Sequence, residues 1–114
     1  MGWDKPVASV RKLSSSEVPT KILLREWLLE RISPTRVLDL YAGAGGMYRA
    51  VWARADTYTG CDLKWRPDNR LAYVCDNTRL LRCIDLSEHT IFDLDAYGSA
   101  WHAMRLIATR RTVQ

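Results

Sequence analysis

The sequence predicts an α/β domain in which helices flank a parallel sheet of about four strands. Three observations support this fold class: a short apolar run at residues 36–41 (RVLDLY), a glycine-rich turn followed by a helical pattern at residues 47–55, and a second strand-like run at residues 57–63 (TYTGCDL). A strand, a turn, a helix and a strand within about 30 residues form a βαβ unit. Such a unit has a right-handed crossover and parallel strands.

The N-terminal part of the chain predicts a flexible arm followed by a packing helix. Residues 1–13 mix glycine, proline and charged residues without a period, and residues 14–114 are expected to form a single domain. Ser14 and Glu17 have capping-box spacing, and the apolar positions of residues 22–32 recur at helical spacing before a Ser-Pro pair ends the helix. This amphipathic helix should cover one side of the sheet.

The second half of the chain predicts two further strands and two further helices. Pro67 makes the connection after the second strand short or irregular. The remaining predicted elements are a third strand at residues 71–75, a short helix at 77–84, a fourth strand at 90–94 and a last helix at about 99–111.

Composition excludes several classes of protein. No run approaches the roughly 18 apolar residues of a membrane span, and the N-terminus lacks a hydrophobic signal core, so we expect a soluble, cytoplasmic protein without a membrane partner. Cys61, Cys75 and Cys83 form no C-x-x-C pair, and neither His89 nor His102 stands at zinc-ligand spacing from them. We therefore expect small buried thiols and no metal site.

The glycine-rich turn lies in the stretch VLDLYAGAGG, residues 37–46. Gly43 permits a tight turn after the first strand, and Gly45 and Gly46 let a ligand approach the main chain at the start of the following helix. Tyr48 occupies the place of the third glycine in the dinucleotide fingerprint G-x-G-x-x-G. The turn therefore predicts a ligand that is smaller than a pyrophosphate or differently shaped.

Acidic residues follow three successive predicted strands, at Asp39, Asp62 and Asp76. Asp62 lies 62 − 39 = 23 positions after Asp39, close to the ~20 at which a carboxylate binds the ribose hydroxyls in dinucleotide sites. Because parallel strands end at one edge of the sheet, the three acids predict a ligand site there. The alternatives without a ligand are that Asp62 simply ends a strand and that Asp76 and Asn77 form a helix N-cap.

VLDLYAGAGG together with Asp62 resembles the first two motifs of class I S-adenosylmethionine-dependent methyltransferases. The resemblance implies a Rossmann-like sheet in the order 3-2-1-4, which is truncated or minimal because the family's sheet has seven strands. It also implies S-adenosylmethionine as cofactor. The corresponding cofactor-binding residues are Asp39, Tyr41, Gly43, Gly45 and Gly46 at the methionine end, Asp62 at the ribose, and Asp76 with Asn77 at the adenine.

The end of the fourth strand, FDLDAYGS at residues 92–99, resembles the Asp-Pro-Pro-Tyr-type motif of amino-nitrogen methyltransferases. It is more similar to the Asp-Leu-Asp-Pro-Phe-Gly-Ser-Pro run of tRNA guanine-N2 methyltransferases, although alanines replace the prolines of that run. The resemblance implies that Asp95 accepts the amino hydrogens, that Tyr97 stacks on the base, and that Asp93 supports them. The alternative is a strand-end acid beside a buried tyrosine.

These motifs predict a methyltransferase acting on an amino nitrogen of RNA, such as tRNA, or of a nucleobase. The alternative is a silent or cofactor-degrading S-adenosylmethionine-binding module, and a plain nucleotide-binding domain is a weaker third. Basic residues between Lys64 and Arg111, with Trp65 and Trp101 among them, could contact a phosphate backbone or form an ordinary solvated surface. The apolar fourth strand predicts an exposed edge that forms a homo-oligomer, is completed by a larger domain, or is hidden by the N-terminal helix.

Overall fold

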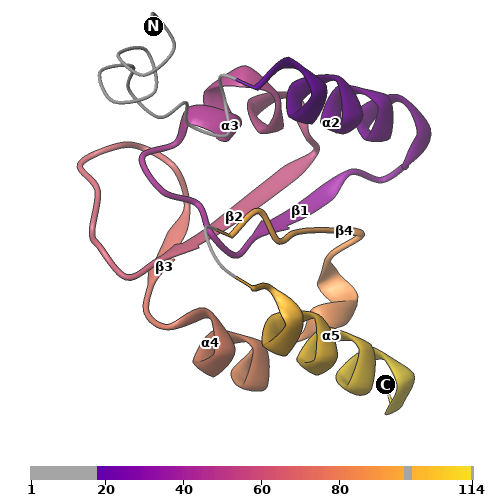
Figure 1. Cartoon of the computed structure of the whole chain (residues 1–114), viewed down its shortest axis with the longest axis vertical. Helices are drawn as coiled ribbons and strands as arrows, with labels where there is room; N and C mark the ends of the chain where they lie inside the picture. The colour runs from indigo at the N-terminus through magenta and orange to yellow at the C-terminus, as the bar shows by residue number, and fades with distance from the viewer. Residues whose placement is uncertain (1–17, 97–98, 114) are drawn as a thin grey trace, which may run out of the picture.

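The computed structural model describes residues 18–96 and 99–113 of the chain. Its centre is a four-stranded parallel sheet in the order β3-β2-β1-β4 (Figure 1). The strands are β1 (Arg36–Asp39), β2 (Thr57–Asp62), β3 (Ala72–Val74) and β4 (Ile91–Asp93). This arrangement confirms the predicted α/β class and the predicted strand order.

Helices cover both faces of the sheet. Figure 1 shows α2 (Pro19–Arg31) and α3 (Gly46–Ala50) above the sheet, and α4 (Asn77–Cys83) and α5 (Trp101–Val113) below it. Short 3-10 turns, η2 (Trp52–Arg54) and η3 (Leu86–Glu88), follow α3 and α4. Among the described residues, no helix is both long and apolar enough to cross a membrane.

Alternating residues of β1 divide the core into two clusters. Val37 is buried with Met47, Val51 and Trp52 on the α2 and α3 face. Leu38 is buried with residues of α4, η3 and α5 on the opposite face. Because successive side chains of a strand point to opposite faces, a strand in the middle of a covered sheet is apolar throughout.

Several helix boundaries differ from the predicted ones. The predicted capping pair Ser14 and Glu17 lies outside the described residues; α2 begins at Pro19, with Val18 as N-cap and no side-chain cap. The single helix predicted at residues 47–55 is divided into α3 and η2, because Val51, with φ −136°, leaves the helical region. Val51 is fully buried, so packing against the sheet outweighs helical continuity here.

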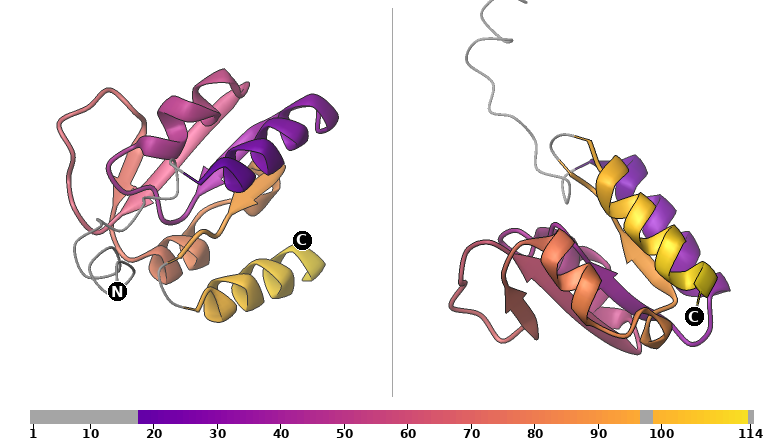
Figure 2. Two further views of the ribbon diagram at one scale, coloured as in Figure 1. Left: turned by 45° about the horizontal axis from the view of Figure 1, so that its top comes forward. Right: turned by 90° about the horizontal axis from the view of Figure 1, so that it is seen from below.

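Exposed apolar side chains lie at the β3 edge of the sheet and on the outer sides of α2 and α5, rather than on β4. On the two helices they are Leu23, Leu24, Trp27, Trp101 and Met104. Ile91 of β4 is buried in the cluster to which α2 contributes, and Phe92 is half-buried against the other cluster. In contrast, Leu71, Tyr73 and Val74 on and beside β3 are exposed. Residues of α2 therefore help to cover Ile91, as one of the three arrangements expected for β4 requires; the homo-oligomer and the larger domain stay predictions. In the right-hand view of Figure 2, α2 and α5 both lie beside β4.

Candidate functional site at the carboxyl edge of the sheet

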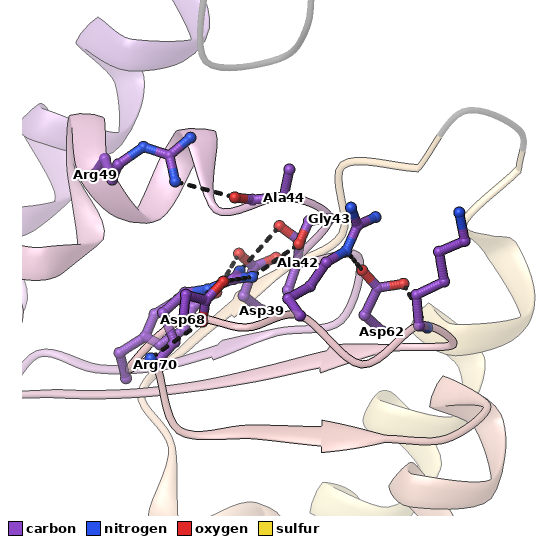
Figure 3. Close-up of polar contacts among 11 residues, drawn as sticks. Asp39, Ala42, Gly43, Ala44, Arg49, Asp62, Asp68 and Arg70 are labelled. Carbon is purple, nitrogen blue, oxygen red and sulfur yellow. Dashed lines mark hydrogen bonds and ion pairs between the residues drawn. The ribbon is translucent and has the colours of Figure 1, made fainter.

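The carboxyl ends of the four parallel strands bring most of the predicted site residues to one edge. Asp39 ends β1 and precedes the glycine turn, Asp62 ends β2, Asp76 follows β3, and Asp93 ends β4. Figure 3 shows Asp39, Asp62 and the glycine turn close together at this edge. Tyr97 lies outside the described residues.

The glycine turn has the backbone that the sequence predicts. Gly43 and Gly45 adopt φ values of +57° and +90°, in the left-handed region that favours glycine. Gly46 is the first residue of α3. A Cβ at Gly45 would lie 3.1 Å from Arg49 Nη1 and 3.1 Å from Arg70 Cζ. Because Gly45 has no Cβ, the side chains of Arg49 and Arg70 can lie close to its backbone. The sequence analysis did not predict these two neighbours.

Arg70 reaches the turn from the loop between β2 and β3 (Figure 3). Its Nη2 donates to the Gly43 carbonyl at 2.9 Å and its Nη1 lies 3.4 Å from the Ala42 carbonyl. The same guanidinium binds Asp68 through two donors, Nε to Oδ1 at 3.1 Å and Nη2 to Oδ2 at 2.8 Å. Arg49 covers the next carbonyl, at Ala44, with a 3.0 Å bond.

Asp62 lies where two hollows of the edge meet. The first hollow, of about 140 Å³, is lined by Tyr41, Asp62, Asp76 and Asn77, with Cys61 and Cys75 among its other walls. The second, of about 70 Å³, is lined by Asp62, Asp68 and Arg70, among others. Asp62 accepts a 3.3 Å hydrogen bond from Arg66 Nε and another from the Lys64 backbone N–H. This acid is the one predicted site residue that borders both hollows.

Asp76 and Asn77 have local structural roles as well as a place in the first hollow. Asp76 is the N-cap of α4, where its carboxylate accepts from the backbone N–H and the hydroxyl of Thr78. Asn77 donates from Nδ2 to the Leu40 carbonyl at 3.1 Å, which ties α4 to the end of β1. The predicted alternative, that Asp76 caps a helix, is therefore confirmed.

The three cysteines differ in burial, so the expectation that all are buried is wrong for Cys83, which is exposed. Cys61 is buried and Cys75 is partly buried, with their Sγ atoms 4.0 Å apart. Burial raises the pKa of the Cys61 thiol, which favours its neutral form. Within the described residues, no group of three His, Cys, Asp or Glu side chains is placed to hold a metal ion.

Asp39 is a buried acid at the start of the glycine turn. Burial raises its pKa to about 7, the nearby Asp93 carboxylate adds to the rise, and a 2.9 Å hydrogen bond from Tyr58 Oη opposes it. The Asp39 carboxyl is therefore a proton donor or acceptor near neutral pH, next to the glycine backbone.

Asp93 and Asp95 are bound by basic side chains from α2. Arg25 grips Asp93 through two 2.8 Å bonds from Nε and Nη2, and Trp52 Nε1 donates to the same carboxylate at 2.8 Å. Lys21 Nζ lies 2.7 Å from Asp95 Oδ1. The sequence analysis did not predict this basic pair. Lys21 and Arg25 are four positions apart and therefore share one side of α2, but exposed apolar residues lie on other sides of the helix, so the sequence does not show which side docks on the sheet.

The basic residues that could contact a phosphate backbone are engaged to different degrees. Arg66 and Arg70 pair with acids of their own loop, and Arg110 donates to the carbonyls of Leu81 and Ile84 at the end of α4. Trp65 and Trp101 are exposed. Exposed aromatic surface is thus present at Trp65 beside the edge, and two of these basic residues, Arg66 and Arg70, are paired with carboxylates.

The edge as a whole brings the glycine turn, Asp62 and the start of α4 together around two small hollows. Comparison of the chain with protein-family models, with curated proteins and with solved structures found no match.

Proposed function

We propose that this protein binds S-adenosylmethionine at the carboxyl edge of its sheet and transfers the methyl group to an amino nitrogen. The observation that carries the proposal is the place of Asp62, a strand-end carboxylate that borders both hollows. A carboxylate there can accept both hydroxyls of a ribose. The glycine turn, with its two left-handed residues, lies on one side of Asp62.

The residues of this edge suit the parts of the cofactor in order. Asp62 would hold the ribose, and the hollow lined by Tyr41, Asp76 and Asn77 would take the adenine. Asp39 and the glycine turn would hold the amino-acid end. The cofactor supplies an activated methyl group, so the protein's task is to position the acceptor.

Asp95 and Asp93 are the proposed acceptor-side residues. A carboxylate at Asp95 can accept the amino hydrogens of a base, and Arg25 fixes the neighbouring Asp93 with two hydrogen bonds. An amino group that binds Asp95 competes with Lys21 at Oδ1, 2.7 Å away, and approaches Arg25 Nη2, which is 3.6 Å from Oδ2. We propose RNA, such as tRNA, or a nucleobase as the substrate, and the cytoplasm as the site of action.

The Lys21–Asp95 contact also favours a second candidate function. A lysine that neutralises the acceptor carboxylate suits a module that binds S-adenosylmethionine without transferring its methyl group, or that degrades it. The two candidates share the cofactor and differ in the role of Asp95.

Calorimetric titration with S-adenosylmethionine and S-adenosylhomocysteine tests the shared part. Asp62→Ala should weaken binding by tenfold or more, about 1.4 kcal/mol. Asp85→Ala is the matched control, since Asp85 is an exposed acid that caps η3. If the wild type fails to bind at millimolar ligand, both candidates are wrong. Light scattering on the same sample measures whether the chain forms an oligomer.

Methyl transfer to RNA, followed with a radiolabelled methyl group, separates the two candidates. Asp95→Ala should abolish transfer and leave cofactor affinity within twofold if Asp95 is the acceptor. Glu30→Gln, at an exposed acid of α2, should leave both unchanged. Cofactor binding by a wild type that methylates no RNA or nucleobase, with an unaffected Asp95→Ala variant, would favour the silent module.

A further inference from the structure

In the loop between β2 and β3, the carboxylate of Asp68 pairs with the buried side chain of Arg70 at the glycine turn. We propose that Arg70 is the residue that binds the carboxylate of the incoming ligand, and that Asp68 occupies this position until the ligand displaces it. The inference rests on the proposed function, because it assigns a role at the same site.

The hydrogen bonds of Arg70 divide into an anchoring set and a binding set. Nη1 and Nη2 reach the Ala42 and Gly43 carbonyls, which fixes the guanidinium to the turn. Nε and Nη2 together bind the two oxygens of Asp68. Such a two-donor pairing is the geometry in which arginine recognises any carboxylate. The structure thus contains a carboxylate-binding position already filled by a carboxylate.

The burial of the two partners makes this exchange feasible. The Arg70 side chain is 3% exposed, whereas the Asp68 side chain is 30% exposed. Asp68 can therefore regain water when it leaves, while Arg70 must keep an anionic partner because a buried unpaired charge is costly. A ligand carboxylate can provide that partner.

The free space at the edge also points to displacement of Asp68. The hollow that Asp68 and Arg70 line has a volume of about 70 Å³ and its neighbour about 140 Å³. Ligand sites usually enclose roughly 300 Å³ or more. A nucleoside carrying an amino acid needs additional room, and Asp68 is on the loop that borders the smaller hollow.

Two other roles for this ion pair are physically reasonable, and they predict different results. If Arg70 only blocks the site, removing either partner should strengthen ligand binding. If the pair only shapes the loop, removing either partner should weaken it. The proposed exchange is the one case in which the two substitutions have opposite signs.

The test is calorimetric titration of the wild type, Arg70→Met and Asp68→Asn with two ligands. S-adenosylhomocysteine carries the carboxylate, and 5′-methylthioadenosine lacks the amino-acid part that bears it. Arg70→Met should weaken S-adenosylhomocysteine binding by tenfold or more, and Asp68→Asn should strengthen it several-fold. Both variants should bind 5′-methylthioadenosine within twofold of the wild type. Asparagine retains an oxygen for the hydrogen bond from the Arg70 backbone N–H, so the turn is preserved.

Arg49→Met is the matched control. Arg49 lies in α3 and donates to the Ala44 carbonyl of the same turn, but it is exposed. This variant should leave both affinities within twofold. Changes of the same sign in Arg70→Met and Asp68→Asn, or equal effects on the two ligands, overturn the inference even though the proposed function stands. If neither ligand binds the wild type or any variant, the proposed function itself fails and the inference fails with it.

Discussion

Replacing Asp39 by asparagine should remove a pH dependence of stability that lies between about pH 4 and pH 7. Asp39 has a pKa of about 7 in the folded protein and 3.8 as an ordinary aspartate, because burial and Asp93 disfavour its charged form. Between these two values the folded protein holds a proton that the unfolded chain has released. The Asp39 contribution to the free energy of unfolding is therefore full below pH 3.8, falls as the pH rises from 3.8 to about 7, and is lost above 7.

The size of this effect follows from the pKa difference. Each unit of pKa difference corresponds to about 1.4 kcal/mol, and the interval from pH 5 to pH 8 covers the two units below pH 7 and the titration itself. Asp39 should therefore reduce the free energy of unfolding by about 2 to 3 kcal/mol across this interval. Asparagine cannot titrate, so Asp39→Asn should lack this contribution.

Urea unfolding at pH 5, 6, 7 and 8 measures the effect, with fluorescence of the buried Trp52 as the signal. His89, whose pKa burial lowers, contributes a slope of opposite sign below pH 6.5. The difference between Asp39→Asn and the wild type isolates Asp39 from it. Asp85→Asn is the control, because the pKa of this exposed acid is lowered and its titration lies below the interval.

Parallel pH profiles for Asp39→Asn and the wild type would refute the reasoning. A further variant checks the cause of the shift. Tyr58→Phe removes the hydrogen bond that lowers the pKa of Asp39, so the transition in stability should move to higher pH. A downward movement would show that the Tyr58 hydrogen bond does not lower the pKa of Asp39.

Two predictions concern stability alone. Arg25→Met should destabilise the protein by about 3 to 5 kcal/mol, because Asp93 stays buried without its cation. The control Arg31→Met, at an exposed ion pair, should change stability by less than about 1 kcal/mol. Equal urea midpoints for the two variants would contradict the prediction for Arg25. Gly45→Ala should lower the free energy of unfolding by about 1 to 2 kcal/mol, because φ at this position is +90°. Gly46→Ala, in α3, should leave stability unchanged or raise it. Similar thermal melts of the two variants would argue against backbone strain at position 45.

Much of the fold follows from local patterns in the sequence. The apolar runs, Pro67 and the glycine turn are local features, and short connections between them leave few ways to arrange a parallel sheet. The order β3-β2-β1-β4 and the gathering of Asp39, Asp62 and Asp76 at one edge agree with the prediction. Two predictions were wrong: the helix at residues 47–55 is divided at Val51, and Cys83 is exposed rather than buried. Both features depend on tertiary packing.

The electrostatic partners of the site could not be predicted in the same way. Lys21 and Arg25 meet Asp95 and Asp93 across separations of 74 and 68 residues. No local pattern specifies which face of α2 docks beside β4. The loop between β2 and β3 is irregular, so its sequence does not indicate that Arg70 lies over the glycine turn.

A parallel α/β sheet with a glycine turn and acids at its carboxyl edge is specified by local features of the sequence. Alternation of side chains, turn chemistry and short crossovers are local constraints, so they can be read from the chain. The cations that pair with the acids near this edge depend on tertiary packing. They are Arg25 for Asp93, Lys21 for Asp95 and Arg70 for Asp68. These pairings depend on how α2 and the loop after β2 pack on the sheet, where burial makes an unpaired charge too costly to leave alone.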